Sequence, residues 1–232
     1  MIYVMSDLHG QYDKYKDMLT QINFSKHDTL YVLGDVLDRG EHGLKILLDM
    51  MNRNNIVMIL GNHEYMAVQC LPIITQDITD EFLNSLEEEK LHILQDWLTE
   101  GGIHTLKEYK TLTLQQRKQI IDYLYESLLF EEISINDKKF ILVHAGLGNY
   151  AKDKMLEDYE LEELVWSRPD YASQGIDDPD TFIVCGHTPT LTLHGKAKIY
   201  HKEQSIVIDC GAYFKEGKLA CLCLDTMEEF YI

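Results

Sequence analysis

Short apolar runs alternate with amphipathic stretches three times in the first third of the chain. In order, each apolar run and its amphipathic partner are 2–5 with 11–22, 30–33 with 44–51, and 56–60 with 65–71. Strands of four or five apolar residues that alternate with helices are typical of βαβ units in a largely parallel sheet. The polar turns after the runs lie about 28 residues apart, close to the roughly 30 residues of one βαβ unit.

The pattern changes twice after the third unit. Residues 77–127 are rich in Leu, Glu, Gln and Lys and contain no proline, which predicts a helical block that Gly101 and Gly102 interrupt. We expect Pro72 to end the helix before this block.

The second half of the chain reads as short strands. Asn136 and Asp137 predict a hairpin turn between the first two of them. The expected strands are 131–135, 139–144, 181–185, 205–209 and 219–224.

The amino-acid composition limits which classes of protein this chain can belong to. The 232 residues are 45% hydrophobic, enough for one domain with a buried core. With 39 acidic against 21 basic residues, the net charge of −18 argues against nucleic-acid and anionic-membrane partners. The odd number of cysteines, five, and the lack of a signal-like segment predict a reduced, cytoplasmic protein.

Side chains able to bind metal ions lie at the ends of five predicted strands. Open parallel sheets bind ligands beyond the carboxyl ends of their strands, so residues after these strands should meet at one edge. The metal-ligating side chains at these ends are Asp7, His9, Asp35, Asn62, His144 and His187.

Six donors are too many for one tetrahedral site and suit two divalent ions bridged by a shared carboxylate. Asp35 lies centrally in the set and is the expected bridge. Mixed carboxylate, imidazole and amide ligands suit Mn, Fe or Zn. Two such ions are a common apparatus for attack on phosphorus.

The residues around these donors carry a family resemblance. The motifs are Asp7-x-His9-Gly10, Gly34-Asp35-x-x-Asp38-Arg39-Gly40, Gly61-Asn62-His63-Glu64, His144-Ala145-Gly146 and Gly186-His187. They resemble the PPP-type metallophosphoesterases, and within that family the compact bacterial and phage serine/threonine protein phosphatases of the bacteriophage lambda phosphatase type. The resemblance implies the α+β, four-layer α/β/β/α calcineurin-like sandwich, with two mixed sheets flanked by helices. It predicts one metallophosphoesterase domain over 1–232, with the helical block 77–127 beside the site.

The resemblance also implies roles for individual residues. It assigns one metal ion to Asp7, His9 and Asp35, and a second to Asp35 together with three other residues. Those three are Asn62, His144 and His187. The implied cofactor is a pair of divalent ions, with Mn²⁺ preferred and Fe or Zn as alternatives.

The catalytic residues follow from the same resemblance. His63 is the implied general acid, Asp38 orients it, and Arg39 binds phosphate. Arg168, two residues after Trp166, matches the position of a second phosphate-binding arginine. The implied reaction is phosphomonoester hydrolysis by a hydroxide bridging the metals, with a phosphoserine or phosphothreonine protein or peptide, or a small phosphoester, as substrate.

Two alternatives stay open at this stage. A bis(5'-nucleosyl)-tetraphosphatase, which hydrolyses diadenosine tetraphosphate, would carry the same motifs with a different substrate. A non-catalytic metal-binding adaptor would keep the metal ligands but would not need His63, Asp38 and Arg39. Glu64 could cap the following helix or orient a neighbour in the site, and we expect the structural role in preference to the second.

Overall fold

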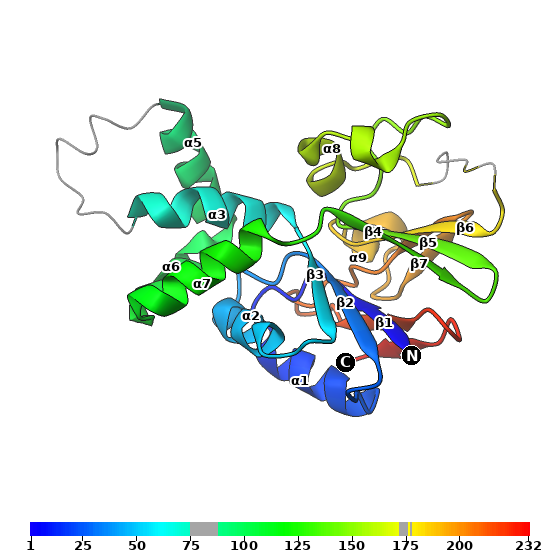
Figure 1. The fold of residues 1–232 in the computed structure, drawn as a ribbon, viewed down its shortest axis with the longest axis horizontal. Coiled ribbons are helices and arrows are strands. Elements are labelled where there is room, and N and C mark those ends of the chain that lie inside the picture. Colours follow the sequence, from blue (N-terminus) through cyan, green and yellow to red (C-terminus); the bar gives the residue numbers. More distant parts are fainter. Residues whose placement is uncertain (75–87, 172–175, 177) are drawn as a thin grey trace.

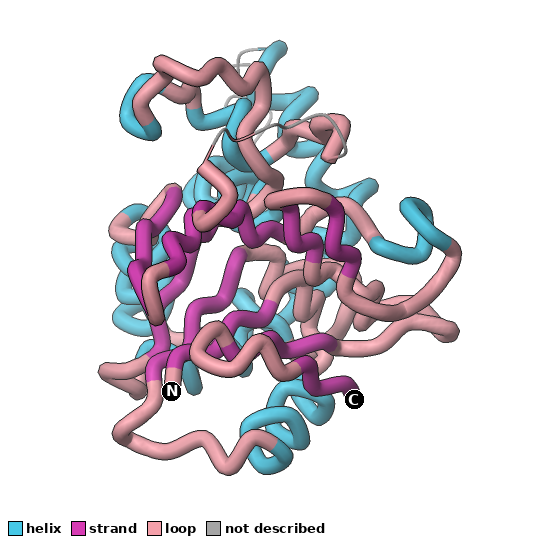
Figure 2. Tube along the Cα trace, turned by 90° about the vertical axis from the view of Figure 1, so that its right-hand side faces the viewer, coloured by secondary structure: helices cyan, strands magenta, loops and turns pink. Residues whose placement is uncertain are grey.

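The computed structural model describes residues 1–74, 88–171, 176 and 178–232. Its strands form two five-stranded mixed sheets, which lie as two layers (Figure 2). Helices α1 and α2 cover the outer face of the first sheet, and α8 and α9 lie on the side of the second (Figure 1). The predicted α+β sandwich of two mixed sheets flanked by helices is confirmed.

The first sheet contains the three predicted βαβ strands. Its strands are β1 (Ile2–Met5), β2 (Thr29–Leu33), β3 (Ile56–Ile59), β9 (Ala220–Cys223) and β10 (Glu229–Tyr231), in the order β10–β9–β1–β2–β3. The helices that follow β1, β2 and β3 are α1 (Tyr12–Gln21), α2 (Gly43–Met51) and α3 (Asn62–Ile74). Because β1, β2 and β3 are parallel, their carboxyl ends meet at one edge.

The second sheet has a parallel centre of its own. Its strands are β4 (Phe130–Ile135), β5 (Lys138–Val143), β6 (Thr181–Cys185), β7 (Tyr200–Lys202) and β8 (Ser205–Val207), in the order β4–β5–β6–β8–β7. Strands β5, β6 and β8 are parallel. The predicted hairpin turn is confirmed, since Asn136 and Asp137 have φ of 51° and 63° between β4 and β5.

The helical block lies beside α2 and α3 (Figure 1). Its described elements are α5 (Glu88–Trp97), the π-helical turn η1 (Leu98–Gly102), α6 (Ile103–Thr111) and α7 (Leu114–Tyr125). The predicted interruption falls at Gly101, whose φ is 108°. Residues 77–87 of the predicted block lie outside the described residues. Shorter elements lie later in the chain: η2 (Leu156–Asp158), α8 (Leu161–Val165) and α9 (Thr190–His194).

Helix α3 differs from its prediction at both ends. It continues through Pro72 to Ile74, so the expected end at the proline is wrong. The proline removes one backbone donor near the end of the helix, while the buried Cys70 and Leu71 still pack on the core. The helix begins at Asn62, so the motif after β3 forms its first turn.

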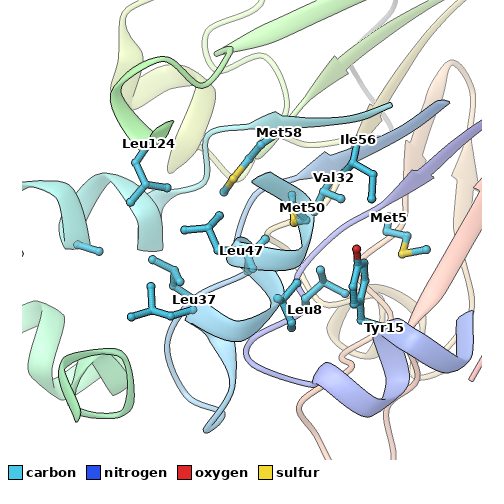
Figure 3. Packing of buried hydrophobic residues seen from close by; sticks show 14 of the residues in the cluster. Met5, Leu8, Tyr15, Val32, Leu37, Leu47, Met50, Ile56, Met58 and Leu124 are labelled. Carbon is cyan, nitrogen blue, oxygen red and sulfur yellow. The ribbon is translucent and has the colours of Figure 1, made fainter. Parts of the chain in front are cut away.

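The core follows the period of two along the strands. Tyr3 and Met5 of β1 point toward α1 and α2, whereas Val4 packs between the sheets. Figure 3 shows Met5 and Leu47 among the side chains of the helix-side cluster. Burial on both faces explains the continuous apolar runs by which these strands were predicted. Among the described helices, none combines the length and apolar character needed to cross a membrane.

Candidate active site

The carboxyl ends of both parallel centres meet where the two sheets face each other. Asp7 follows β1, Asp35 follows β2 and Asn62 follows β3, while His144 follows β5 and His187 follows β6. All five are more than nine-tenths buried. The sheets are joined here, because the His187 N–H donates to Asp7 Oδ2 at 3.0 Å.

The backbone around these residues is unusual. Left-handed φ is costly for residues other than glycine and tends to cluster at functional sites. Six of the predicted site residues adopt it, with φ between 39° and 64°: Asp7, His9, Asp35, Asp38, Arg39 and His187. The tight turns at the strand ends thus direct these side chains into the shared edge.

Backbone carbonyls fix the orientation of two imidazoles. His9 Nδ1 donates to the Leu37 carbonyl oxygen at 3.0 Å, and His144 Nδ1 donates to that of Leu33 at 2.6 Å. Burial lowers the pKa of both histidines, that of His9 to about 3, against the attraction of Asp35. The neutral rings therefore keep a lone pair on Nε2, the arrangement typical of metal-binding histidine.

Those lone pairs converge on Asp35. Asp35 Oδ2 lies 3.6 Å from His9 Nε2, and Oδ1 lies 3.3 Å from His144 Nε2. Two groups able to hold a cation share this carboxylate, one with His9 and His63, the other with His144 and His187. Burial alone would raise the pKa of Asp35, but the surrounding histidines, His144 first, hold it below its usual value.

This donor set fits two divalent ions. His144 Nε2 also lies 3.0 Å from Asn62 Oδ1, so acceptor atoms face one another with no proton between them. A cation between such atoms would remove their repulsion. The central position of Asp35, with one oxygen toward each group, is that of a bridging ligand.

Asp7 lies beside a second buried acid that the sequence analysis missed. The pKa of Asp7 is raised well above its usual value by burial, then by Asp209 and Asp35. Burial also raises the pKa of Asp209 to about 7, although its Oδ1 accepts the Gly211 N–H at 2.8 Å. Asp209 follows β8, the third parallel strand of the second sheet, so strand-end position was the signal that could have identified it.

The three predicted catalytic residues of the first sheet form a chain of contacts. His63 Nδ1 lies 2.7 Å from Asp38 Oδ2, and Arg39 Nη2 lies 3.1 Å from His63 Nε2. Burial would lower the pKa of His63, but Asp35 and Asp38 raise it above its ordinary value. A histidine whose pKa is raised, beside an arginine that lines a cleft, suits proton donation to a group bound there.

Arg168 reaches the same place from the second sheet. Its Nη1 donates to Thr188 Oγ1 at 3.2 Å and lies 3.4 Å from the His187 carbonyl oxygen. Both arginines line a cleft of about 480 Å³. The other lining residues are Asp35, Asn62, Met66, Asp96, Thr99, Glu100, Trp166 and His187. The structure thus brings all ten predicted residues to one edge, while their individual roles stay predictions.

Glu64 holds the turn that carries Asp35. It is fully buried, and its carboxylate accepts four backbone N–H groups at 2.7 to 3.2 Å. The donors are Asp35, Val36, Leu37 and Gly61. Three of them belong to the turn after β2, so Glu64 orients neighbours in the site, the less favoured of the two roles considered from the sequence. The fourth, Gly61, directly precedes α3, so Glu64 also satisfies a backbone donor at the start of that helix.

Comparisons with known proteins agree with this geometry. The family model for calcineurin-like phosphoesterases matches residues 1–220. Serine/threonine-protein phosphatase 2 of Salmonella typhimurium is 31% identical over 168 residues, which are 72% of this chain and 67% of that protein.

Other similarities point to a second kind of enzyme. The symmetrical bis(5'-nucleosyl)-tetraphosphatase of Wigglesworthia glossinidia brevipalpis is 34% identical over 118 residues, 48% of this chain. The match spans less than half of that relative, 42% of its length. The solved structure of a candidate diadenosine tetraphosphatase has a TM-score of 0.63 and 16% identity, covering 100% of this chain and 92% of its own, which shows a shared fold.

Proposed function

This chain belongs to the calcineurin-like phosphoesterase family, and from that premise we propose that it is a serine/threonine protein phosphatase of the compact bacterial and phage type. Its substrate would be a protein or peptide phosphorylated on serine or threonine, with small phosphoesters also accepted. One observation carries the proposal: the His63–Asp38 pair and Arg39 adjoin the convergent lone pairs around Asp35.

The proposed cofactor is a pair of divalent ions, with Mn²⁺ preferred over Fe or Zn. Asp7, His9 and Asp35 would hold one ion. Asp35 would hold the other with Asn62, His144 and His187. When bound, the ions would supply positive charge to the phosphate oxygens and lower the pKa of a water nucleophile.

The two arginines would bind the phosphate. A guanidinium matches phosphate oxygens with paired N–H donors, and Arg39 and Arg168 reach one cleft from different sheets. In this structure Arg39 Nη2 lies 3.5 Å from Glu100 Oε2, a partly exposed ion pair that a phosphate dianion can displace. Binding from two sides would orient the ester bond toward His63.

His63 would protonate the leaving group. Serine and threonine alkoxides are strongly basic and need a proton as the ester bond breaks. Asp38 accepts from His63 Nδ1, which leaves Nε2 on the side of Arg39, a residue that lines the cleft. The raised pKa of His63 supports a proton on that ring near neutral pH.

The charge of the cleft favours a phosphopeptide as substrate. Asp96 and Glu100 line the side formed by α5 and η1. Carboxylates there would attract basic residues near the phosphorylated position and repel a chain of phosphates. An acidic wall therefore supports a basic phosphopeptide and disfavours a dinucleoside tetraphosphate.

A symmetrical tetraphosphatase is the second candidate. The similarity to the Wigglesworthia enzyme favours it. Trp166 also lines the cleft with an exposed ring, packed edge-on against Tyr65, and an exposed indole can stack on a purine base. The third alternative, a metal-binding adaptor, gives no reason for the His63–Asp38–Arg39 contacts.

A substrate panel tests these candidates directly. Purified protein would be loaded with Mn²⁺, Fe²⁺ or Zn²⁺ and assayed on a basic phosphoserine peptide, diadenosine tetraphosphate and p-nitrophenyl phosphate. We expect the highest kcat/KM for the phosphopeptide with Mn²⁺. Faster turnover of the tetraphosphate would favour the second candidate, and no turnover of any substrate would favour the adaptor.

A further inference from the structure

Two buried side chains of the helical block bind Asp38. Trp97 Nε1 donates to Asp38 Oδ2 at 2.9 Å, and Thr105 Oγ1 donates to Asp38 Oδ1 at 2.6 Å. The Asp38 N–H in turn donates to Thr105 Oγ1 at 2.9 Å. All three residues are at most 1% exposed. Both oxygens of Asp38 are therefore occupied by residues from another part of the chain.

These contacts determine how Asp38 meets His63. Asp38 Oδ2 accepts from both Trp97 Nε1 and His63 Nδ1, the latter at 2.7 Å. A carboxylate held at both oxygens cannot rotate without breaking a buried hydrogen bond, which is costly. The direction of the His63 ring is thus coupled to Trp97 and Thr105 through Asp38.

The same segment also supports Arg39. The Arg39 N–H donates to the Gly101 carbonyl oxygen at 3.2 Å. Gly101 has φ of 108°, and a Cβ there would lie 2.6 Å from the Arg39 backbone nitrogen. Only glycine allows the turn η1 to approach this closely. The segment from Trp97 to Thr105 therefore contacts both residues that flank His63 in the proposed mechanism.

We propose that Trp97 and Thr105 are positioning residues for the general acid His63 and act through Asp38. Both residues are buried and neither lines the cleft, so they would act without touching the substrate. Their hydrogen bonds keep the carboxylate directed at His63 Nδ1, so that Nε2 faces the leaving group. This inference rests on the proposed function, since it assigns the helical block a part in leaving-group protonation.

Leaving-group dependence separates positioning from a merely structural role. Phenolate resembles the tyrosine side chain, whose pKa is about 10, and benefits from a proton, whereas p-nitrophenolate leaves without one. If His63 is wrongly positioned, the hydrolysis of phenyl phosphate slows more than that of p-nitrophenyl phosphate. A general loss of structure lowers both rates equally.

The variants are Trp97→Phe and Thr105→Val, which keep the bulk and remove the donor, with Thr105→Ser as the matched control that keeps the hydroxyl. With Mn²⁺-loaded protein we expect Trp97→Phe and Thr105→Val to lower kcat for phenyl phosphate by about 10-fold or more. For p-nitrophenyl phosphate the change should stay within about 2-fold, and Thr105→Ser should resemble the wild type. Equal losses on both esters, or none, would overturn the proposal.

A spectroscopic measurement decides the question without turnover. The His63 Nδ1 proton should give a slowly exchanging low-field NMR signal in metal-free protein, assigned by its loss in His63→Asn. We expect the signal to persist in Thr105→Ser and to broaden or disappear in Trp97→Phe and Thr105→Val. An unchanged signal in both would overturn the inference even if no ester is hydrolysed. Because aryl esters and NMR are used, a failure on phosphopeptides would refute only the proposed substrate.

Discussion

His144 Nδ1 lies 2.6 Å from the backbone carbonyl oxygen of Leu33, so an imidazole of the second sheet is anchored on the first. Leu33 ends β2, two residues before Asp35. Because a carbonyl oxygen only accepts, the contact leaves the His144 Nε2 lone pair directed at Asp35. The proposed metal site is therefore built by the packing of the two sheets as well as by the ligands themselves.

Metal removal should destabilise the protein. We expect two Mn²⁺ ions per chain in calorimetric titration of chelator-treated protein, with a Tm that rises as the ions bind. Each ion at a hundred times its Kd would add about 2.7 kcal/mol to the free energy of unfolding. Asp35→Asn should weaken both binding events, whereas Asp122→Asn, exposed on α7, should change neither. A wild-type stoichiometry below two would contradict the bridged pair.

Replacing His63 should separate binding from proton donation. We expect His63→Asn to lower kcat on a phosphoserine peptide by about 100-fold or more, because the alkoxide must then leave unprotonated. Turnover of p-nitrophenyl phosphate should fall far less, and Mn²⁺ stoichiometry should stay the same. An equal loss of kcat on both substrates would contradict the assignment of His63 as the general acid.

The predictable part of the site was local in sequence. A strand followed by an acidic or histidine-containing turn marks Asp7 or Asp35 without knowledge of the tertiary structure, and parallel strands must bring such turns together. Strand ends also predicted His144 and His187, although the strands β7 and β10 at the sheet margins were missed. These outer strands have only three residues each and contain few apolar side chains, so they lack the apolar run that marked the inner strands.

The supporting residues depend on long-range packing. Trp97 and Thr105 lie 59 and 67 residues from Asp38, and no periodicity indicates that a core tryptophan will use its N–H on a site carboxylate. Asp209 was predicted as the last residue of a strand, whereas β8 ends at Val207, and no motif surrounds it. The sequence therefore predicted which residues reach the site better than which residues hold them there.

Glu64 should matter for stability. A glutamine at this position has one acceptor oxygen and a donor amide, so part of the set of four backbone N–H groups would lose its acceptor. We expect Glu64→Gln to lower the free energy of unfolding by about 2–4 kcal/mol. In urea denaturation the exposed Glu126→Gln should change it by less than about 0.5 kcal/mol. A similarly small effect of Glu64→Gln would contradict its role in holding the turn.

Asp209 should give metal-free protein a measurable pH dependence. Burial raises its pKa to about 7, so the stability that protonated Asp209 allows is fully present below pH 4 and is lost as pH rises through 7. Asp209→Asn cannot ionise and should therefore gain stability relative to wild type between pH 4 and 8, by a few kcal/mol at most. Urea denaturation across this range in chelator measures the difference. A constant difference would show that the folded protein does not raise this pKa.

Glu100 should tune substrate choice through both its charge and its ion pair with Arg39. Glu100→Gln removes a carboxylate that repels phosphates and releases the guanidinium, so the tetraphosphate should gain more than the basic phosphopeptide. We expect the ratio of kcat/KM for phosphopeptide to that for diadenosine tetraphosphate to fall about 2- to 5-fold at low salt, and less at high salt. Glu203→Gln is the matched control, because its side chain is 59% exposed against 57% for Glu100 and it lies in the β7–β8 turn. Equal shifts in both variants would assign the preference to net charge instead of to the acidic wall of the cleft.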